Sequence, residues 1–312
     1  MKVHYALPEG EAYRIERRRH PLVVAVGVFD GYHRGHQAIV RALLRARHAG
    51  ERSAVVTFLE HPTAALRPGE EPPQISTLAE RINAFARAGI DETFVLRFDR
   101  AFAALSPAAF LDDVIAGALG ARALVVGANF RFGAKRAGDV AFAQTHLGRR
   151  GGEAIGVANV LVEGERVSST RIRAAIAAGD CATADRLLGL PYVVRGTVVF
   201  GAGRGHDLGF PTANLSVPPE KMLPPDGVYA ITARHDGRDY PGLVSIGANP
   251  TFDGRTRTVE AWLLDFVGSM YGEDVALRDF RFVRGQKRFD SVDELLVQMR
   301  EDAAAVSLPS FV

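Results

Sequence analysis

Two histidines three residues apart, His33 and His36, are the first side chains in the sequence with an obvious capacity for chemistry. They lie in the glycine-rich stretch GVFDGYHRGHQ, residues 27–37, directly after the apolar run LVVAVGV at 22–28. Imidazole rings donate hydrogen bonds to phosphate oxygens, and glycines allow close approach of the backbone to a ligand. The stretch is therefore compatible with a phosphate-binding loop, a metal site or a tight turn.

The metal interpretation is the weakest of the three. A zinc site would call for thiolate partners or an HExxH arrangement, and neither accompanies His33 and His36. The usual nucleotide fingerprints are also absent, since the sequence has no GxxxxGK[ST] and no GxGxxG after the first strand. Taken alone, the stretch does not separate a phosphate loop from a turn.

A second anion-binding pattern occurs at RVSSTRIRAAI, residues 166–176. Ser169 and Thr170 stand at the start of a predicted helix, with Arg166 and Arg173 on either side. Hydroxyl groups, guanidinium groups and the free N–H groups of a helix N-terminus all favour phosphate. A well-capped helix with arginines facing solvent would explain this segment equally well if it stood alone.

A third pattern, GAGRGHDLGFPTANL, covers residues 201–215. Gly201, Gly203 and Gly205 suggest a loop that closes over phosphates. Thr212 and Asn214 are two residues apart, so in an extended chain they face the same way. Their hydroxyl and amide oxygens suit Mg²⁺, which prefers hard oxygen ligands. The competing interpretation is a glycine loop that leads into an ordinary edge strand.

The elements that must position these residues fall into two patterns. In the first half, short apolar runs alternate with helical periodicity, which predicts a doubly wound parallel sheet with residues 27–37 at its carboxyl edge. The expected strands are 22–28, 53–58, 92–98, 122–127 and 155–162, and the expected helices are 36–49, 77–88, 106–119 and 138–147. Helix starts are signalled by Thr77 with Glu80, and by Ser106 with Pro107.

After Leu190 and Pro191 the pattern changes to successive strands without crossover helices. This predicts an antiparallel barrel or sandwich with one C-terminal helix, and a domain boundary that separates residues 1–185 from 186–312. The expected strands are 192–200, 227–234, 240–247, 257–266 and 275–283, followed by a helix at 291–306.

Composition narrows the class of protein. The 312 residues carry a formal net charge of +2, with 24 basic against 20 acidic residues in 1–185 and 14 against 16 in 186–312. This mild excess is weak for a nucleic-acid footprint. The sequence has no apolar run of membrane-spanning length and only one cysteine, Cys181. We therefore expect a cytoplasmic protein that binds small molecules and has no nucleic-acid or membrane partners, and a weak homo-oligomer is compatible with the sequence.

The combination of motifs resembles a known family. HxGH after the first strand, together with SSTRIR, looks like the nucleotidyltransferase superfamily, and VVGANFRFGAKRAGD at 125–139 is similar to the adenylyltransferase half of prokaryotic bifunctional riboflavin kinase/FAD synthetases. PTAN at 211–214 and TVEAWLLDF at 258–266 resemble the riboflavin kinase module, a six-stranded antiparallel barrel. The resemblance implies a Rossmann-like first domain and a barrel as the second. It also implies that riboflavin is phosphorylated to FMN and that FMN is adenylylated to FAD, with ATP as co-substrate and Mg²⁺ as cofactor.

The resemblance also implies roles for individual residues. Glu260 matches the catalytic carboxylate of the kinase, Asn129 would position the reacting groups, and Thr212 and Asn214 would bind Mg²⁺. His33 and His36 would contact ATP phosphates, while Arg173 would hold the triphosphate with Arg166, Ser169 and Thr170. The remaining nucleotide-binding positions are Gly27, Phe29, Asp30 and Gly35 in the first domain and Gly201, Gly203 and Gly205 in the second.

Overall fold

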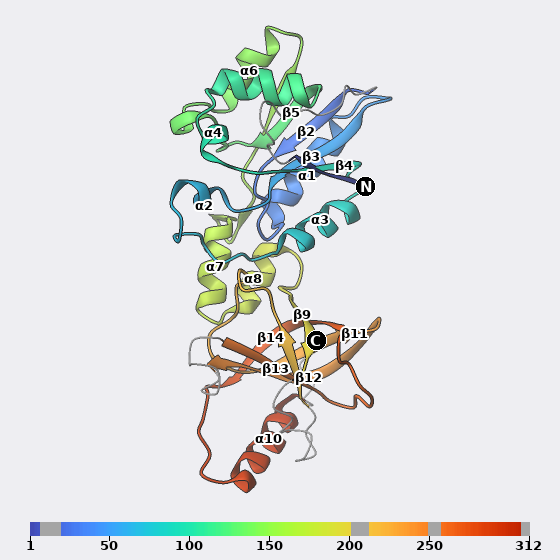
Figure 1. Cartoon of the computed structure of the whole chain (residues 1–312), viewed down its shortest axis with the longest axis vertical. Coiled ribbons are helices and arrows are strands. Elements are labelled where there is room, and N and C mark those ends of the chain that lie inside the picture. The colour runs from blue at the N-terminus through green and yellow to red at the C-terminus, as the bar shows by residue number, and fades with distance from the viewer. Residues whose placement is uncertain (7–19, 201–211, 249–256, 307–312) are drawn as a thin grey trace. The chain divides into compact units, whose positions relative to one another are not determined.

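A computed structural model describes residues 1–6, 20–200, 212–248 and 257–306. The chain divides into two compact units, Met1–Ser169 and Thr170–Val312 (Figure 1). Within the described residues, no helix combines the length and apolar character that crossing a membrane requires.

The first unit is built on a six-stranded sheet in which every neighbouring pair is parallel, as predicted. The strand order β1-β4-β3-β2-β5-β6 places β2 in the interior and β1 at one edge. The sequence did not predict β1. The strands are β1 (Lys2–Ala6), β2 (Leu22–Val26), β3 (Arg52–Phe58), β4 (Glu92–Leu96), β5 (Ala121–Gly127) and β6 (Glu153–Val157).

The helices of this unit occur close to the predicted positions. Thr77 forms the expected capping box with Glu80 at the start of α3, and Ser106 caps α5 ahead of Pro107. The stretch after α5 differs from the prediction, because it continues as a π-helix, η1 (Phe110–Ala118). The helices are α1 (Arg34–Arg45), α2 (Pro62–Leu66), α3 (Leu78–Arg87), α4 (Arg100–Ala103), α5 (Pro107–Ala109), η2 (Ala134–Arg136) and α6 (Val140–Gly148); the short strands β7 (Leu161–Val162) and β8 (Glu165–Arg166) form a hairpin.

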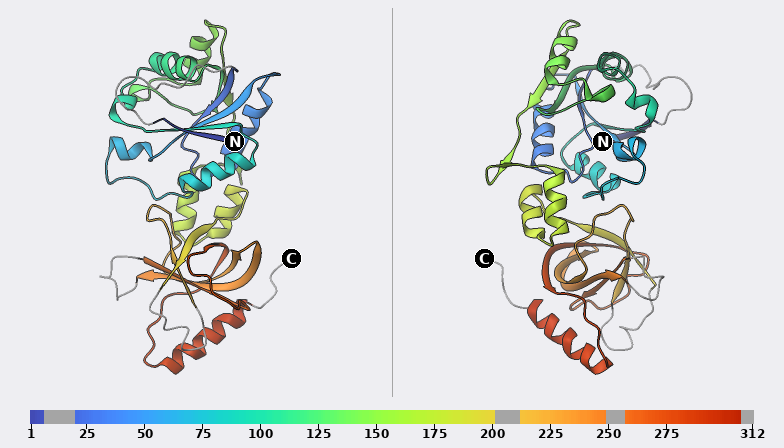
Figure 2. Two further views of the ribbon diagram at one scale, coloured as in Figure 1. Left: turned by 45° about the vertical axis from the view of Figure 1, so that its right-hand side comes forward. Right: turned by 90° about the vertical axis from the view of Figure 1, so that its left-hand side faces the viewer.

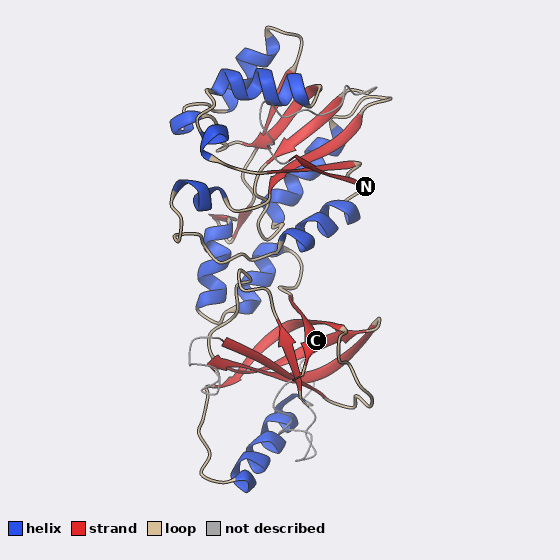
Figure 3. Cartoon of the chain, viewed as in Figure 1, coloured by secondary structure: helices blue, strands red, loops and turns tan. Residues whose placement is uncertain are grey.

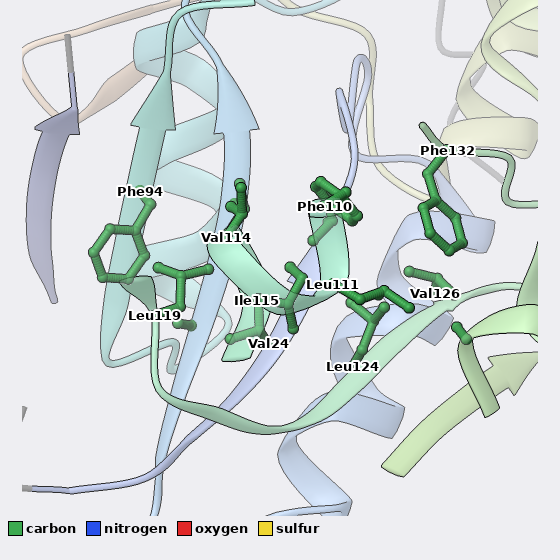
Figure 4. Packing of buried hydrophobic residues seen from close by; sticks show 14 of the residues in the cluster. Val24, Phe94, Phe110, Leu111, Val114, Ile115, Leu119, Leu124, Val126 and Phe132 are labelled. Carbon is green, nitrogen blue, oxygen red and sulfur yellow. The ribbon is translucent and has the colours of Figure 1, made fainter. Parts of the chain in front are cut away.

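The sheet is covered on both faces, as its continuous apolar strands require. Successive residues of β2 belong to different cores, with Val24 in the cluster that η1 and α6 cover and Val23 in the cluster that α1 and α3 cover. Figure 4 shows the first of these clusters, in which Leu111 and Ile115 of η1 pack on the strands. Burying each such side chain contributes about 1.5–3 kcal/mol, so the two cores fix the sheet that carries the first motif.

The second unit contains two short helices, a barrel and a C-terminal helix. α7 (Ser169–Ala177) begins at the last residue of the first unit, and α8 (Cys181–Leu188) runs from its N-cap Asp180 to Gly189, a left-handed C-cap with φ 75°. The six strands then close into an antiparallel barrel in the order β10-β13-β12-β11-β14-β9, which confirms the barrel and excludes the sandwich (Figures 2 and 3). They are β9 (Val194–Val199), β10 (Ala213–Ser216), β11 (Gly227–His235), β12 (Arg238–Ala248), β13 (Arg257–Leu263) and β14 (Asp274–Arg284).

The predicted C-terminal helix is present as α10 (Val292–Val306). Ala303 and Val306 pack with Trp262 of β13 against an apolar patch on the barrel. Asp302, only 4% exposed, accepts hydrogen bonds from Arg284 Nε of β14 at 3.0 and 3.1 Å. The helix is thus attached to the barrel by apolar packing and by one buried ion pair.

Asp185 of α8 gives the second unit a pH-dependent stability. Burial raises the pKa of its carboxyl group to about 6, and the nearby Asp279 carboxylate adds to the shift. Because the folded pKa lies above the unfolded value, the folded state loses stability as pH rises from about 4 to about 6. We therefore expect Asp185→Asn to raise the unfolding free energy at pH 8 by on the order of 1 kcal/mol, since solvent screens a partly exposed carboxylate.

Thermal unfolding between pH 4 and pH 8 measures this effect, which should shrink toward pH 4. Asn keeps the oxygen that accepts the Tyr192 N–H. The matched control is Asp180→Asn, because hydrogen bonds from Thr183 lower the pKa of Asp180, and its replacement should not stabilise the protein at pH 8. A stabilisation by Asp185→Asn that is equal at pH 4 and pH 8 would contradict the assignment.

Candidate active sites

The loop between β2 and α1 has an unusual backbone. Phe29, Gly31 and Tyr32 have φ angles of 55°, 81° and 42°, so two side-chain-bearing residues adopt the left-handed conformation. Such residues cost of order 1 kcal/mol each and persist only where neighbouring groups hold them. Gly27 makes room for the loop, because a Cβ there would lie 3.2 Å from the Phe29 ring.

His33 is the N-cap of α1, and its Nδ1 accepts a hydrogen bond from the His36 N–H at 3.3 Å. An Nδ1 that accepts assigns the proton of a neutral ring to Nε2, which is then a donor. The two imidazoles stack, with ring centroids 3.6 Å apart and an interplanar angle of 16°. A side chain in place of Gly35 would crowd this packing, since a Cβ there would lie 3.0 Å from His33 Cε1.

Both histidines are neutral near pH 7. Burial lowers the pKa of His33 to about 4, with Asp30 acting in the opposite direction. Burial also lowers the pKa of His36 well below its usual value, and His33 and Arg81 add to that effect. The rings can therefore act as uncharged hydrogen-bond donors, while positive charge at the site comes from Arg166 and from the N-terminus of α1.

A cavity of about 270 Å³ in the first unit brings several predicted residues together. This volume is just below the roughly 300–1,000 Å³ of pockets that hold a whole small ligand, and it suits part of one, such as a phosphate chain. Asn129 faces it and accepts a hydrogen bond from Asn159 Nδ2 at 3.2 Å. The predicted residues that line it are His33, Gly35, His36, Asn129, Arg166 and Ser169.

Three other predicted positions of the first motif, Gly27, Phe29 and Asp30, are not among the residues that line the cavity. The Phe29 ring is buried and meets the His36 ring edge-on, with centroids 5.1 Å apart. The Asp30 carboxylate accepts from Ser76 N at 2.9 Å, and its backbone carbonyl accepts from Ser169 Oγ at 2.9 Å. These contacts shape the loop, and direct nucleotide binding by the three residues stays a prediction.

Thr170 and Arg173 lie in the second unit, within α7. Thr170 is exposed and Arg173 is half-buried. Their predicted part in holding the triphosphate stays a prediction.

Arg81 contacts the loop of this site and was not predicted as a site residue from the sequence. Its side chain is 2% exposed, and Nη1 donates to the carbonyl of Val28 at 2.7 Å. A signal for it was present, because Arg81 lies four residues before Phe85, on the buried face of α3. A charged residue on the apolar face of an amphipathic helix calls for a buried partner.

The second candidate site lies on the barrel. Asn214 of β10 is in register with Glu260 of β13, and Glu260 is in register with Ser245 of β12. Opposed residues of antiparallel strands share a face, so the three side chains form a row. Glu260 and Asn214 are half-buried, as is Thr212 just before β10. Gly201, Gly203 and Gly205 lie outside the described residues.

Further contacts support this row. Gln286 Nε2 donates to Ser245 Oγ at 3.0 Å and to the Ile246 carbonyl at 2.9 Å. Glu260 lies two residues before Trp262, on the face of β13 that α10 covers through Trp262. A carboxylate, an amide and a hydroxyl thus lie in a row on one half-buried face, which can accept a proton and present oxygen ligands. In the described part of the chain, no group of three or more His, Cys, Asp or Glu side chains is arranged so that it could hold a metal ion.

Comparison with known proteins identifies the family of the chain. A model of FAD synthetase matches residues 15–171, and a model of riboflavin kinase matches residues 188–308. The bifunctional riboflavin kinase/FMN adenylyltransferase of Listeria monocytogenes is 35% identical over 283 residues, covering 90% of each chain. That of Pseudomonas fluorescens is 37% identical over 286 residues, covering 91% of each.

A solved structure agrees in fold. A Streptococcus pneumoniae chain that bears the name macrolide-efflux protein superposes with a TM-score of 0.85 at 35% identity, covering 94% of this chain and 96% of that one. The matches extend over both units and include both motif sets. The chain belongs to the family of bifunctional riboflavin kinase/FMN adenylyltransferases, with an N-terminal FAD synthetase domain and a C-terminal riboflavin kinase domain.

Proposed function

We propose that the cavity beside His33 and His36 binds the phosphates of ATP during adenylyl transfer, and that the Asn214–Glu260 row catalyses phosphorylation of riboflavin. The observation that carries the first half is the convergence of the HxGH loop, Asn129 and Arg166 on one cavity. The observation that carries the second is the register that sets Asn214 opposite Glu260.

In adenylyl transfer, a phosphate oxygen of FMN attacks the α-phosphorus of ATP, a new P–O bond forms, and pyrophosphate leaves. The attacking oxygen is already anionic, so no general base is needed. Catalysis then consists of positioning and of neutralising the charge that develops on the phosphates. Neutral His33 and His36 suit this role because they donate hydrogen bonds from a preorganised, buried position, while Arg166 supplies charge.

The kinase reaction makes a different demand. A ribityl hydroxyl of riboflavin attacks the γ-phosphorus of ATP, ADP leaves, and the hydroxyl proton must pass to a base. Glu260 is the carboxylate on the row and is assigned that role. Thr212 and Asn214 offer the oxygen ligands that Mg²⁺ prefers, and the bound ion would neutralise phosphate charge.

The assignment extends to the organisation of the chain. Residues 1–185 carry adenylyl transfer and 186–312 carry phosphorylation, so FMN made by one domain is the substrate of the other. The partners are small molecules, with no requirement for nucleic acid. A cytoplasmic location and weak self-association accompany this proposal as further predictions.

Purified protein incubated with riboflavin, ATP and Mg²⁺ should produce FMN first and FAD second, resolved by chromatography over time. Chelation of the divalent cation should stop FMN formation, and added Mg²⁺ should restore it. The absence of any phosphorylated flavin at every time point would overturn the proposal. FMN without FAD would overturn its first half alone.

A further inference from the structure

Arg81 is a buried charge outside the motifs quoted from the sequence. The side chain is 2% exposed and sits on the inward face of α3. The effective cost of burying one ion is several kcal/mol unless other groups compensate it. A residue with this cost has to be supported by its neighbours, and those neighbours belong to the HxGH loop.

The contacts of Arg81 converge on the start of that loop. Nη1 donates to the Val28 carbonyl at 2.7 Å, and Thr57 Oγ1 donates to the same oxygen at 3.1 Å. Burial lowers the pKa of the Arg81 guanidinium, and attraction to Asp30 opposes that shift. The Nε atom has no hydrogen-bond partner among the described residues. The guanidinium is therefore held by one carbonyl and by the charge of Asp30.

The segment just before Arg81 holds the same loop from the same side. Ser76 Oγ accepts from the Gly31 N–H at 2.8 Å, and the Asp30 carboxylate accepts from Ser76 N at 2.9 Å. Together with Arg81 these contacts tie Val28, Asp30 and Gly31 to residues 75–81. We call residues 75–81 the loop clamp.

The loop clamp holds the part of the backbone that is conformationally unfavourable. Phe29, with φ of 55°, lies between the tied residues Val28 and Asp30, and Tyr32, with φ of 42°, directly follows the tied Gly31. The Phe29 ring in turn contacts His36 with centroids 5.1 Å apart, and His33 begins α1 directly after Tyr32. Release of the loop would therefore move both imidazoles, although Arg81 is not among the residues that line the cavity.

We propose that Arg81 is a positioning residue of the adenylyltransferase site, which fixes the Val28 carbonyl and attracts Asp30 so that His33 and His36 are preorganised for the ATP phosphates. The inference rests on the proposed function of that cavity. Arg81 touches no substrate in this role and acts only through the loop.

The test compares Arg81→Met and Arg81→Lys with Arg87→Met, an exposed arginine of the same helix. Misplacement of reacting groups by about 1 Å costs on the order of 10²-fold, so Arg81→Met should lower kcat/KM for ATP in FAD formation by about that factor. The KM for FMN should change less than about twofold. Arg81→Lys keeps the charge and should recover about tenfold of the loss, while Arg87→Met should match the wild type.

Different outcomes would overturn the proposed function and the role of Arg81. Wild-type protein that makes no FAD would overturn the proposed function itself. FAD formation that is equally fast in wild type and in Arg81→Met would overturn the role of Arg81, and so would a rise in the KM for FMN as large as the rise in the KM for ATP. If Arg81→Met does not fold, Ser76→Ala is the second test. It removes from the loop clamp only the Ser76 hydroxyl, which contacts Gly31, and should lower kcat/KM for ATP about tenfold. Wild-type kinetics in both Ser76→Ala and Arg81→Lys would refute the inference.

Discussion

Glu260→Gln is expected to lower FMN formation from riboflavin by about 10²–10⁴-fold, the range that a general base contributes, and to leave conversion of added FMN into FAD unchanged. Gln has nearly the shape of Glu, so the register with Asn214 and Ser245 should persist. What is lost is the group that accepts the hydroxyl proton. Chromatography of flavins from two parallel reactions, one started with riboflavin and one with FMN, measures both rates.

The matched control is Asp274→Asn, which removes an exposed carboxylate of β14 that accepts from Thr197 Oγ1 at 2.7 Å. This variant should form FMN at the wild-type rate, because its carboxylate belongs to a surface contact. Loss of FAD formation from added FMN in Glu260→Gln would refute the assignment of separate sites. Undiminished FMN formation would refute the role of Glu260 as base.

The sheet of the first unit was predictable because its strands are buried on both faces and read as continuous apolar runs. β1 was missed because it is not buried in this way. It is an edge strand with Tyr5 58% exposed, and its sequence KVHYA at residues 2–6 contains no apolar run that would have predicted a strand. Its place depends on pairing with β4, ninety residues away in the register Lys2–Glu92. Local pattern carries little information about such pairing.

The π-helix η1 also had no signal in the apolar periodicity. The helical run at 106–119 was predicted, but not the wider turn within it. Gly117 fits that turn because it has no side chain: a Cβ there would lie 2.8 Å from the Asp112 carbonyl oxygen. In the barrel, closure depends on the four-residue strand β10, whose pairing with both β9 and β13 excludes the sandwich that the sequence left open.

The motifs of the candidate sites were predictable from the sequence, but the long-range contacts that support those motifs were not. HxGH and SSTRIR predicted a phosphate site because their residue types suit phosphate at a helix start. The support of that site could not be found in the same way, since Arg81 reaches Val28 across 53 positions of the chain. The neutral state of His33 likewise depends on burial, which the sequence alone does not give.

His36→Ala should have the opposite effect to Glu260→Gln on the two activities. We expect it to lower FAD formation from FMN by about 10²–10³-fold, the loss typical of one preorganised donor to a developing anion. The ring also stacks on His33 and meets Phe29, so its removal frees two further groups of the loop. FMN formation from riboflavin should continue at the wild-type rate, as measured in the same chromatographic assay.

His48→Ala is the matched control, because its side chain is 71% exposed beyond the end of α1 and should not affect either rate. The pH dependence adds a second check. Burial keeps the pKa of His36 well below its usual value, so protonation of this ring should not reduce wild-type FAD formation between pH 8 and pH 6. A His36→Ala variant that makes FAD normally would show that the stacked pair is only the cap of a helix. A variant that loses both activities would show that the two domains depend on each other for more than FMN.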